Sequence, residues 1–512
     1  MKSFVISAAL SAFLSTLSGT FASSQHPTVT IDTGEIVGTS TSVPGSETGI
    51  NKFLGIPFGY ADRFSVPEKA QPWSGPLNTT AFKPACIQRF ACKTTETFNI
   101  PAPEESEDCL YINVLIPESR GKNRTVMVWL YGGGLQFGHG GFHMYDGSAL
   151  AAHEDVVYVS FNYRTNVFGF PNSSELPLES RNLGFLDQRL ALDWVQRNIY
   201  AFGGDSSKVT IFGESAGSFS VDALLTSFPK DSSPPFRAAI MQSGEISYGG
   251  YPDPRELWPD TTSVWETLAD TLNCTGSQSS LDCLKKMPAA SIREVIEQQS
   301  LFFNPTYDNI TLNPNAARDR AQSKIASIPI LSGTDAQEGR FIILGQNNVS
   351  AYLDDLLVGQ PDQVRKAIEA AYPVGGWEFP SDFDAIAQME TEVLVHCGAA
   401  LVANDTATSG TQSWRYYFNA SFPNTQQFPG EGVYHSSEIP IIYGTYPAVC
   451  DPYAGPGWNA IGTGTTFYGG EEDYDLDVGM LGANGGAGVE ILRQRDVDAR
   501  CGLWAPVLRK RF

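Results

Sequence analysis

The residues best suited to chemistry surround Ser215, in a Gly-x-Ser-x-Gly pentapeptide that spans residues 213–217. A strand-like run, 209–212, precedes the pentapeptide, and a helix-compatible run follows it. A serine on such a tight strand-to-helix turn exposes its hydroxyl above the edge of a sheet, and its flanking glycines avoid clashes with the neighbouring strand and helix. Ser215 is therefore a candidate nucleophile. With 49 glycines in 512 residues, the pentapeptide alone also fits chance.

A serine nucleophile needs a base, and the base needs an acid that orients it. On a fold with this turn, the chain order is serine, then Asp or Glu, then histidine. Of the six histidines, His396 and His435 follow Ser215. We favour His435, which lies in a polar loop before residues 439–442, because the apolar run around His396 is typical of a core histidine.

The acid is expected after a late strand at 328–333, where the loop offers Asp335 and Glu338. Position alone favours neither, and both fit a solvated loop carboxylate. The oxyanion of an acyl-transfer intermediate also needs backbone N–H donors. We expect these from Ala216, after the nucleophile, and from Gly133 and Gly134, which end a strand-like run.

Buried strands that alternate with helices must position these groups. Continuous apolar runs separated by helical spacing predict an α/β fold with a large, mostly parallel sheet buried on both faces. The expected strands are 125–131, 156–161, 209–212, 238–241 and 328–333, and the expected helices include 186–199, 265–272 and 364–372. Helical excursions within about 250–430 are expected to form a cap, and 451–490 are expected to be dominated by loops.

Composition narrows the class of protein. The net charge of −22 argues against a nucleic-acid partner.

The N-terminus is typical of a secretory signal peptide over residues 1–22, with Lys2 before an apolar run and small residues before a cleavage point after Ala22. No later run is apolar enough to span a membrane. Eight cysteines and N-x-S/T sequons fit a disulfide-bonded, secreted glycoprotein. The histidines and cysteines show no metal-ligand spacing, so neither a metal nor another cofactor is expected. The sequons begin at Asn78, Asn123, Asn172, Asn273, Asn309, Asn348, Asn404 and Asn419.

From about Val29 to the C-terminus, the chain resembles the type-B carboxylesterases and lipases, a family that includes cholinesterases and fungal lipases. Residues 202–217 resemble the family's active-site signature and 107–114 its second signature, and further similar blocks are 53–57, 162–164 and 182–189. The resemblance implies an α/β-hydrolase fold with one catalytic domain over 23–512. It also implies that Glu338, directly before a glycine, is the acid. The implied site is the triad Ser215, Glu338 and His435, the oxyanion donors Gly133, Gly134 and Ala216, the pocket carboxylate Glu214, and Ser243, a buried serine that supports the His–Glu pair.

By the same analogy, three disulfides are expected: Cys86–Cys109, Cys274–Cys283 and Cys397–Cys501. Cys92 and Cys450 have no assigned counterpart, so their pairing stays open. Two departures from the family matter. Residues 87–106 contain no tryptophan, which argues against choline esters. After Tyr446, a span with three prolines replaces helices of the family, and this shortening bears on how the His435 loop packs and so on activity.

The sequence thus predicts a secreted serine hydrolase that cleaves carboxylic esters through an acyl-enzyme. Its partner would be a small-molecule or lipid ester, and the oligomeric state stays open. A general carboxylesterase is favoured. A triacylglycerol lipase of the same family is an alternative, because the 86–109 loop could be a lid, although its mixed apolar and acidic residues suggest modest hydrophobicity. The other alternative is a catalytically impaired binding or adhesion relative, since the C-terminal shortening keeps that class open.

Overall fold

The computed structural model describes residues 26–90, 102–119, 121–248, 262–422, 426, 430–445, 477–481 and 489–509. Within these residues an 11-stranded sheet has the order β16-β15-β14-β13-β12-β11-β9-β10-β8-β4-β3. The run from β10 to β15 is parallel, and β16, β8, β4 and β3 pair antiparallel at the two sides. The predicted α/β class with a large, mostly parallel sheet is confirmed.

The strands of this sheet are β3 (Thr39–Thr41), β4 (Ile50–Pro57), β8 (Tyr111–Pro117), β9 (Arg124–Leu130), β10 (Val157–Phe161), β11 (Gly204–Glu214), β12 (Ala238–Gln242), β13 (Ile330–Asp335), β14 (Ser413–Phe418), β15 (Asp477–Leu481) and β16 (Val489–Arg493). Smaller sheets join β1 (Thr28–Ile31), β2 (Gly34–Val37) and β7 (Leu77–Asn78), and β5 (Gly59–Tyr60) and β6 (Glu68–Lys69). Because β9, β10 and the second half of β11 are buried on both faces, their residues are almost continuously apolar.

The α-helices are α2 (Ser148–Glu154), α3 (Asn166–Gly169), α4 (Leu183–Asn198), α5 (Ala216–Thr226), α7 (Thr262–Thr271), α8 (Ser280–Lys286), α9 (Ala289–Gln298), α10 (Ala316–Ala321), α11 (Gly339–Ile342), α12 (Val349–Leu356), α13 (Asp362–Ala371), α14 (Asp382–Thr391), α15 (Cys397–Thr408), α16 (Ile439–Tyr443), α17 (Gln494–Val497) and α18 (Cys501–Arg509). Short 3-10 turns are η1 (His143–Tyr145), η2 (Leu178–Ser180), η3 (Ile199–Phe202) and η4 (Ile246–Tyr248), and η5 (Glu392–His396) is a π-helix.

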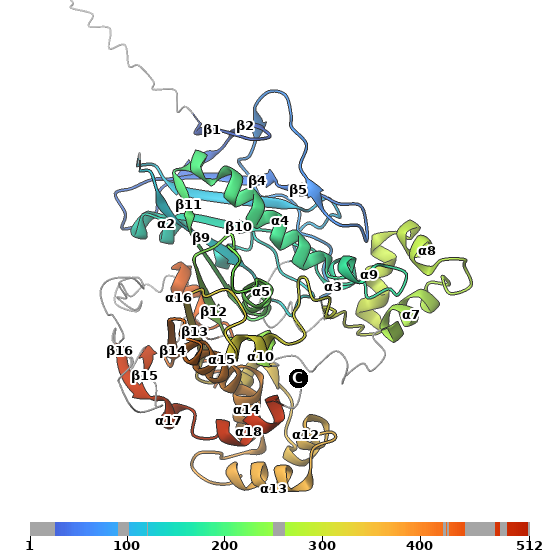
Figure 1. The fold of residues 1–512 in the computed structure, drawn as a ribbon, viewed down its shortest axis with the longest axis vertical. Coiled ribbons are helices and arrows are strands. Elements are labelled where there is room, and N and C mark those ends of the chain that lie inside the picture. Colours follow the sequence, from blue (N-terminus) through green and yellow to red (C-terminus); the bar gives the residue numbers. More distant parts are fainter. Residues whose placement is uncertain are drawn as a thin grey trace, which may run out of the picture.

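Every residue of helix α5 is buried. It packs on β11 and β12, and α15 packs on β13 and β14. Two helical excursions leave the sheet, α7–α10 between β12 and β13, and α11–α15 between β13 and β14. Figure 1 shows α12, α13 and α14 of the second excursion, with α18, at the end of the molecule away from β1 and β2. The parallel core thus holds all strand ends that carry the predicted site.

Within 451–490, where loops are expected to dominate, the described residues form β15 and the start of β16, because β15 continues the parallel ladder of β14. The remainder of that span, the proposed signal peptide 1–22, Cys92, Cys450 and residues 446–458 lie outside the described residues. The three expected disulfides form, Cys86–Cys109, Cys274–Cys283 and Cys397–Cys501. Among the described helices, none has both the length and the apolar character to cross a membrane.

Candidate active site

Ser215 occupies a strained turn directly after β11. Its φ of 56° and ψ of −123° lie outside the regions that non-glycine residues favour, and it is the N-cap of α5. A Cβ on Gly217 would overlap the carbonyl oxygen of Leu130, and one on Gly213 would lie 2.6 Å from the carbonyl carbon of Gly217. The two glycines are therefore required by close packing, as the sequence predicts.

The structure brings Glu338 and His435 together. Glu338 is the residue directly before α11, just after β13, and His435 lies in the loop between β14 and α16. Nδ1 of His435 lies 2.6 Å from Oε2 of Glu338, and both side chains are buried. Asp335, the other candidate acid, makes no hydrogen bond to His435 among the described residues. It accepts a hydrogen bond from Ser437 instead (Oγ to Oδ2, 3.0 Å).

Backbone bonds hold these two segments in register. The N–H of Gln337 donates to the carbonyl of Val433 (2.9 Å), and the N–H of Val433 donates to Oε1 of Gln337 (3.0 Å). The second oxygen of Glu338, Oε1, accepts the N–H of Asp335 (2.7 Å). The carboxylate therefore has a fixed orientation toward the imidazole.

The other imidazole nitrogen faces Glu214. Nε2 of His435 lies 3.2 Å from Oε1 of Glu214, an oxygen that also accepts a hydrogen bond from Ser436 Oγ (2.6 Å). The Oγ of Ser215 makes no hydrogen bond within the described part of the chain. Hydrogen bonds of this kind are often long in ligand-free enzymes and tighten when substrate binds.

The electrostatics of the cluster favour a charged imidazole. Burial lowers the pKa of His435, but the negative charges of Glu214 and Glu338 outweigh burial and raise this pKa to about 9. Burial raises the pKa of Glu214, and the positive charge of His435 opposes that shift. The carboxylates thus stabilise the imidazolium that general-base catalysis would generate.

The glycine run after β9 lies beside the serine. A Cβ on Gly132 would be 2.8 Å from Oε2 of Glu214 and 3.1 Å from Cβ of Ser215. Gly133 and Gly134 have φ values of 101° and 62°, and the carbonyl of Gly133 accepts the N–H of Phe137 (3.2 Å). Glycine is needed here because the backbone turns left-handed and approaches the serine closely.

A reciprocal tyrosine pair fixes the strand end that carries this run. Tyr131 and Tyr163 stack with ring centroids 4.1 Å apart. The hydroxyl of each donates to the backbone carbonyl of the other, both at 2.7 Å. Ala216, the third predicted oxyanion donor, is the first residue of α5, where backbone N–H groups have no partner within the helix.

Two other sequence candidates lie behind the site. Ser243 is buried and its N–H donates to the carbonyl of Gly333 (2.8 Å), but its Oγ has no hydrogen-bond partner among the described residues. His396 is a core residue, as the sequence suggested. Its Nδ1 lies 2.9 Å from Thr334 Oγ1, and its Nε2 lies 2.9 Å from Asp498.

Sequence reasoning missed several contacts of this site. Ser436, Gln337 and Glu438 bind the carboxylates or fix the histidine loop, and each lies within three residues of a predicted site residue. Their proximity in sequence was the available signal. A polar loop offers many such side chains, and the chain order does not say which of them turn inward.

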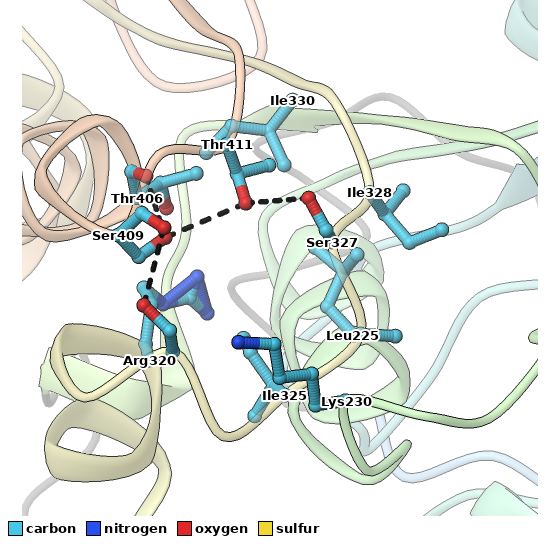
Figure 2. Close-up of a pocket in the computed structure, with 12 residues that line it drawn as sticks. Leu225, Lys230, Arg320, Ile325, Ser327, Ile328, Ile330, Thr406, Ser409 and Thr411 are labelled. Atoms are coloured by element: carbon cyan, nitrogen blue, oxygen red, sulfur yellow. Dashed lines mark hydrogen bonds between the residues drawn. The ribbon is translucent and has the colours of Figure 1, made fainter.

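A metal-like cluster and a cavity lie elsewhere. His396, Asp498 and Cys501 have ligand atoms close together, but Cys501 is in a disulfide and Asp498 forms an ion pair with Arg415, which argues against a metal ion there. A cavity of about 250 Å³ lies at the edge where β13 and β14 begin, opposite the catalytic edge (Figure 2). Its lining includes Lys230, Ile328, Ile330, Ser409 and Thr411.

The sheet is mixed, a strained serine follows β11, and a buried His–Glu contact lies beyond the ends of β13 and β14. Together these features define a protein of the α/β-hydrolase class. Residues 25–452 match the model of the carboxylesterase family. A solved structure of a PNB esterase aligns with a TM-score of 0.72 and 27% identity, and the alignment covers 93% of this chain and 100% of that one.

Curated relatives agree with this assignment. The chain is 32% identical to the para-nitrobenzyl esterase of Bacillus subtilis (strain 168) over 82% of this chain and 83% of the relative. It is 32% identical to the acetylcholinesterase of Bungarus fasciatus, over 81% and 73%, and 29% identical to liver carboxylesterase 1F of Rattus norvegicus, over 82% and 81%. The chain belongs to the carboxylesterase family and is a carboxylic ester hydrolase.

Proposed function

We propose that this hydrolase is a general carboxylesterase that works through an acyl-enzyme on Ser215. The observation that carries the proposal is the 2.6 Å contact of His435 with Glu338 beside the strained Ser215 turn. A serine hydroxyl becomes an effective nucleophile only when a positioned base removes its proton. His435 is the one described histidine that combines an orienting carboxylate with a place near Ser215.

In the proposed reaction, Ser215 Oγ attacks the ester carbonyl while His435 Nε2 takes its proton. The N–H groups of Gly133, Gly134 and Ala216 receive the developing oxyanion. His435 then returns the proton to the departing alcohol, which leaves an acyl group on Ser215. Water attacks this ester with His435 again as base, and the carboxylic acid is released.

Glu338 and Glu214 have different roles in this scheme. Glu338 fixes the imidazole through Nδ1 and stabilises its charged form. Glu214 faces Nε2 in the ligand-free site, so it competes with Ser215 for that nitrogen until substrate binds. Ser243 fills buried space next to the β13 strand end and supports the His–Glu pair by packing.

We further propose that the protein is secreted after removal of residues 1–22. The three disulfides support an oxidising compartment. N-terminal sequencing of protein collected from the culture medium tests this point, with residue 23 expected first. A mature chain that keeps residues 1–22 would contradict it.

Substrate preference separates the candidate classes. We expect purified protein to hydrolyse p-nitrophenyl acetate and butyrate faster than p-nitrophenyl palmitate, with Ser215→Ala as the inactive control. A rate that peaks on the palmitate ester and rises above its solubility limit would indicate the lipase alternative. No turnover of any ester by the wild-type protein would indicate the binding or adhesion alternative.

A further inference from the structure

A pair of buried carboxyl groups, which the proposed reaction does not use, lies directly behind the histidine loop. Asp335 ends β13 and Glu438 precedes α16, and both are almost fully buried. They therefore join the strand that leads to Glu338 with the loop that carries His435. Neither contacts an arginine or lysine in the described residues.

Each carboxyl group has one oxygen bonded to a neutral donor. Ser437 Oγ donates to Oδ2 of Asp335 (3.0 Å), and Gln242 Nε2 donates to Oε1 of Glu438 (3.1 Å). The remaining oxygens, Asp335 Oδ1 and Glu438 Oε2, receive no hydrogen bond from a described donor. The two carboxyl groups also interact with each other, and a direct hydrogen bond between these free oxygens requires a proton on one of them.

We propose that Asp335 and Glu438 share one proton and act as positioning residues for His435. The shared proton ties the histidine loop to β13. It also removes one negative charge from beneath an imidazole that already faces Glu214 and Glu338. The inference rests on the proposed role of His435 as base.

The surroundings of the pair explain why it retains a proton. Burial, with the charges of Glu438 and Glu338, raises the pKa of Asp335 well above its usual range. Burial and the charge of Glu214 raise the pKa of Glu438 to about 8. The titratable groups that interact with the pair are Glu214 from β11, Glu338 and His435, Tyr145 from η1, and Tyr416 and Tyr417 from β14.

The sign of the pH effect follows. Below about pH 8 the pair holds its proton, whereas above it two negative oxygens face each other and their repulsion loosens the contact that ties the histidine loop to β13. Activity should therefore decline on the alkaline side. Between about pH 5 and the pKa of the pair, the native state binds a proton that the unfolded chain does not, so the free energy of unfolding should fall as pH rises.

The test uses Asp335→Asn, because an amide donates to Glu438 without a titrating proton and keeps the charge of the singly protonated pair. We expect its kcat/KM for p-nitrophenyl butyrate at pH 7 to stay within about threefold of the wild-type value. In its pH–rate profile, the alkaline decline of kcat/KM should begin at least about one pH unit higher than in wild type. Glu438→Gln should behave in the same way. Asp335→Ala, which leaves Glu438 without its partner, should lose about tenfold at every pH.

Unfolding provides a readout that needs no activity. From pH 5 to pH 8 the thermal midpoint of wild type should fall relative to that of Asp335→Asn, because only wild type loses the shared proton. The exposed control variant Asp355→Asn should keep a constant midpoint difference from wild type over the same range. This outcome supports the pair even if no ester is turned over. The inference would be overturned if both Asp335→Asn and Glu438→Gln kept the alkaline limb of wild type and if their thermal midpoints differed from that of wild type by the same amount at every pH.

Discussion

At the scale of single residues, the charge around His435 sets the pH dependence of the reaction. General-base catalysis needs the neutral imidazole, and the pKa of His435 is raised to about 9, so activity should increase with pH on the acidic side, until the Asp335–Glu438 pair loses its proton. Glu214→Gln removes a negative charge 3.2 Å from Nε2. We expect the acidic limb of kcat/KM to move to lower pH by about one unit.

The control for this variant is Glu68→Gln on the exposed strand β6, which should leave the acidic limb in place. An acidic limb that stays fixed, or that moves to higher pH, in Glu214→Gln would show that Glu214 does not govern the protonation of the base.

The sequence predicted the identities of Ser215 and His435 from residue type, spacing and chain order. It did not separate Glu338 from Asp335 without the family resemblance, because the two lie three residues apart after the same expected strand. What separates them is the rotation of the chain after β13. Glu338 turns toward the imidazole while Asp335 turns toward Ser437 and Glu438.

At the scale of elements, a buried ion pair fixes the segment after β10 to helix α4. Asp187 is fully buried and accepts the backbone N–H (3.0 Å), Nε (2.8 Å) and Nη2 (2.8 Å) of Arg164. Asp187→Ala leaves a buried guanidinium without its partner. We expect it to lower the free energy of unfolding by about 3–5 kcal/mol, measured by urea denaturation.

A matched control exists on the same helix. Asp193 is partly exposed and pairs with Arg197 at 2.9 Å, so Asp193→Ala should cost no more than about 1 kcal/mol. Equal losses for the two variants would mean that the Arg164–Asp187 contact is not a specific anchor.

Elements with a strong local pattern were predictable, and those defined by distant partners were not. The apolar run at 125–131 predicted β9 within a residue of its observed bounds. Strand β15 was missed because its five residues include a glycine and an aspartate and are held in place by β14, about sixty residues earlier in the chain. Local sequence carries no record of that pairing.

At the scale of the whole molecule, the Cys397–Cys501 disulfide connects α15 to the C-terminal helix α18 across 104 residues. Trp504 of α18 is fully buried against this region. A disulfide that closes a loop of about 100 residues raises the free energy of unfolding by up to about 4.7 kcal/mol, whereas one that closes a loop of about ten residues raises it by about 2.7 kcal/mol.

Replacing Cys397 and Cys501 by serine should therefore lower the thermal midpoint more than the same replacement of Cys274 and Cys283, which lie nine residues apart. Differential scanning calorimetry of the two double variants measures the difference. A larger loss from the short loop would contradict this ranking.

Covalent trapping can show whether Ser215 forms the acyl-enzyme. A fluorophosphonate ester reacts with an activated serine and leaves a stable adduct, which peptide mass spectrometry can locate. We expect one adduct, on the peptide that contains Ser215, and we expect Ser215→Ala to lose both the adduct and p-nitrophenyl butyrate hydrolysis. An adduct on another residue, or hydrolysis by Ser215→Ala at the wild-type rate, would contradict this role of Ser215.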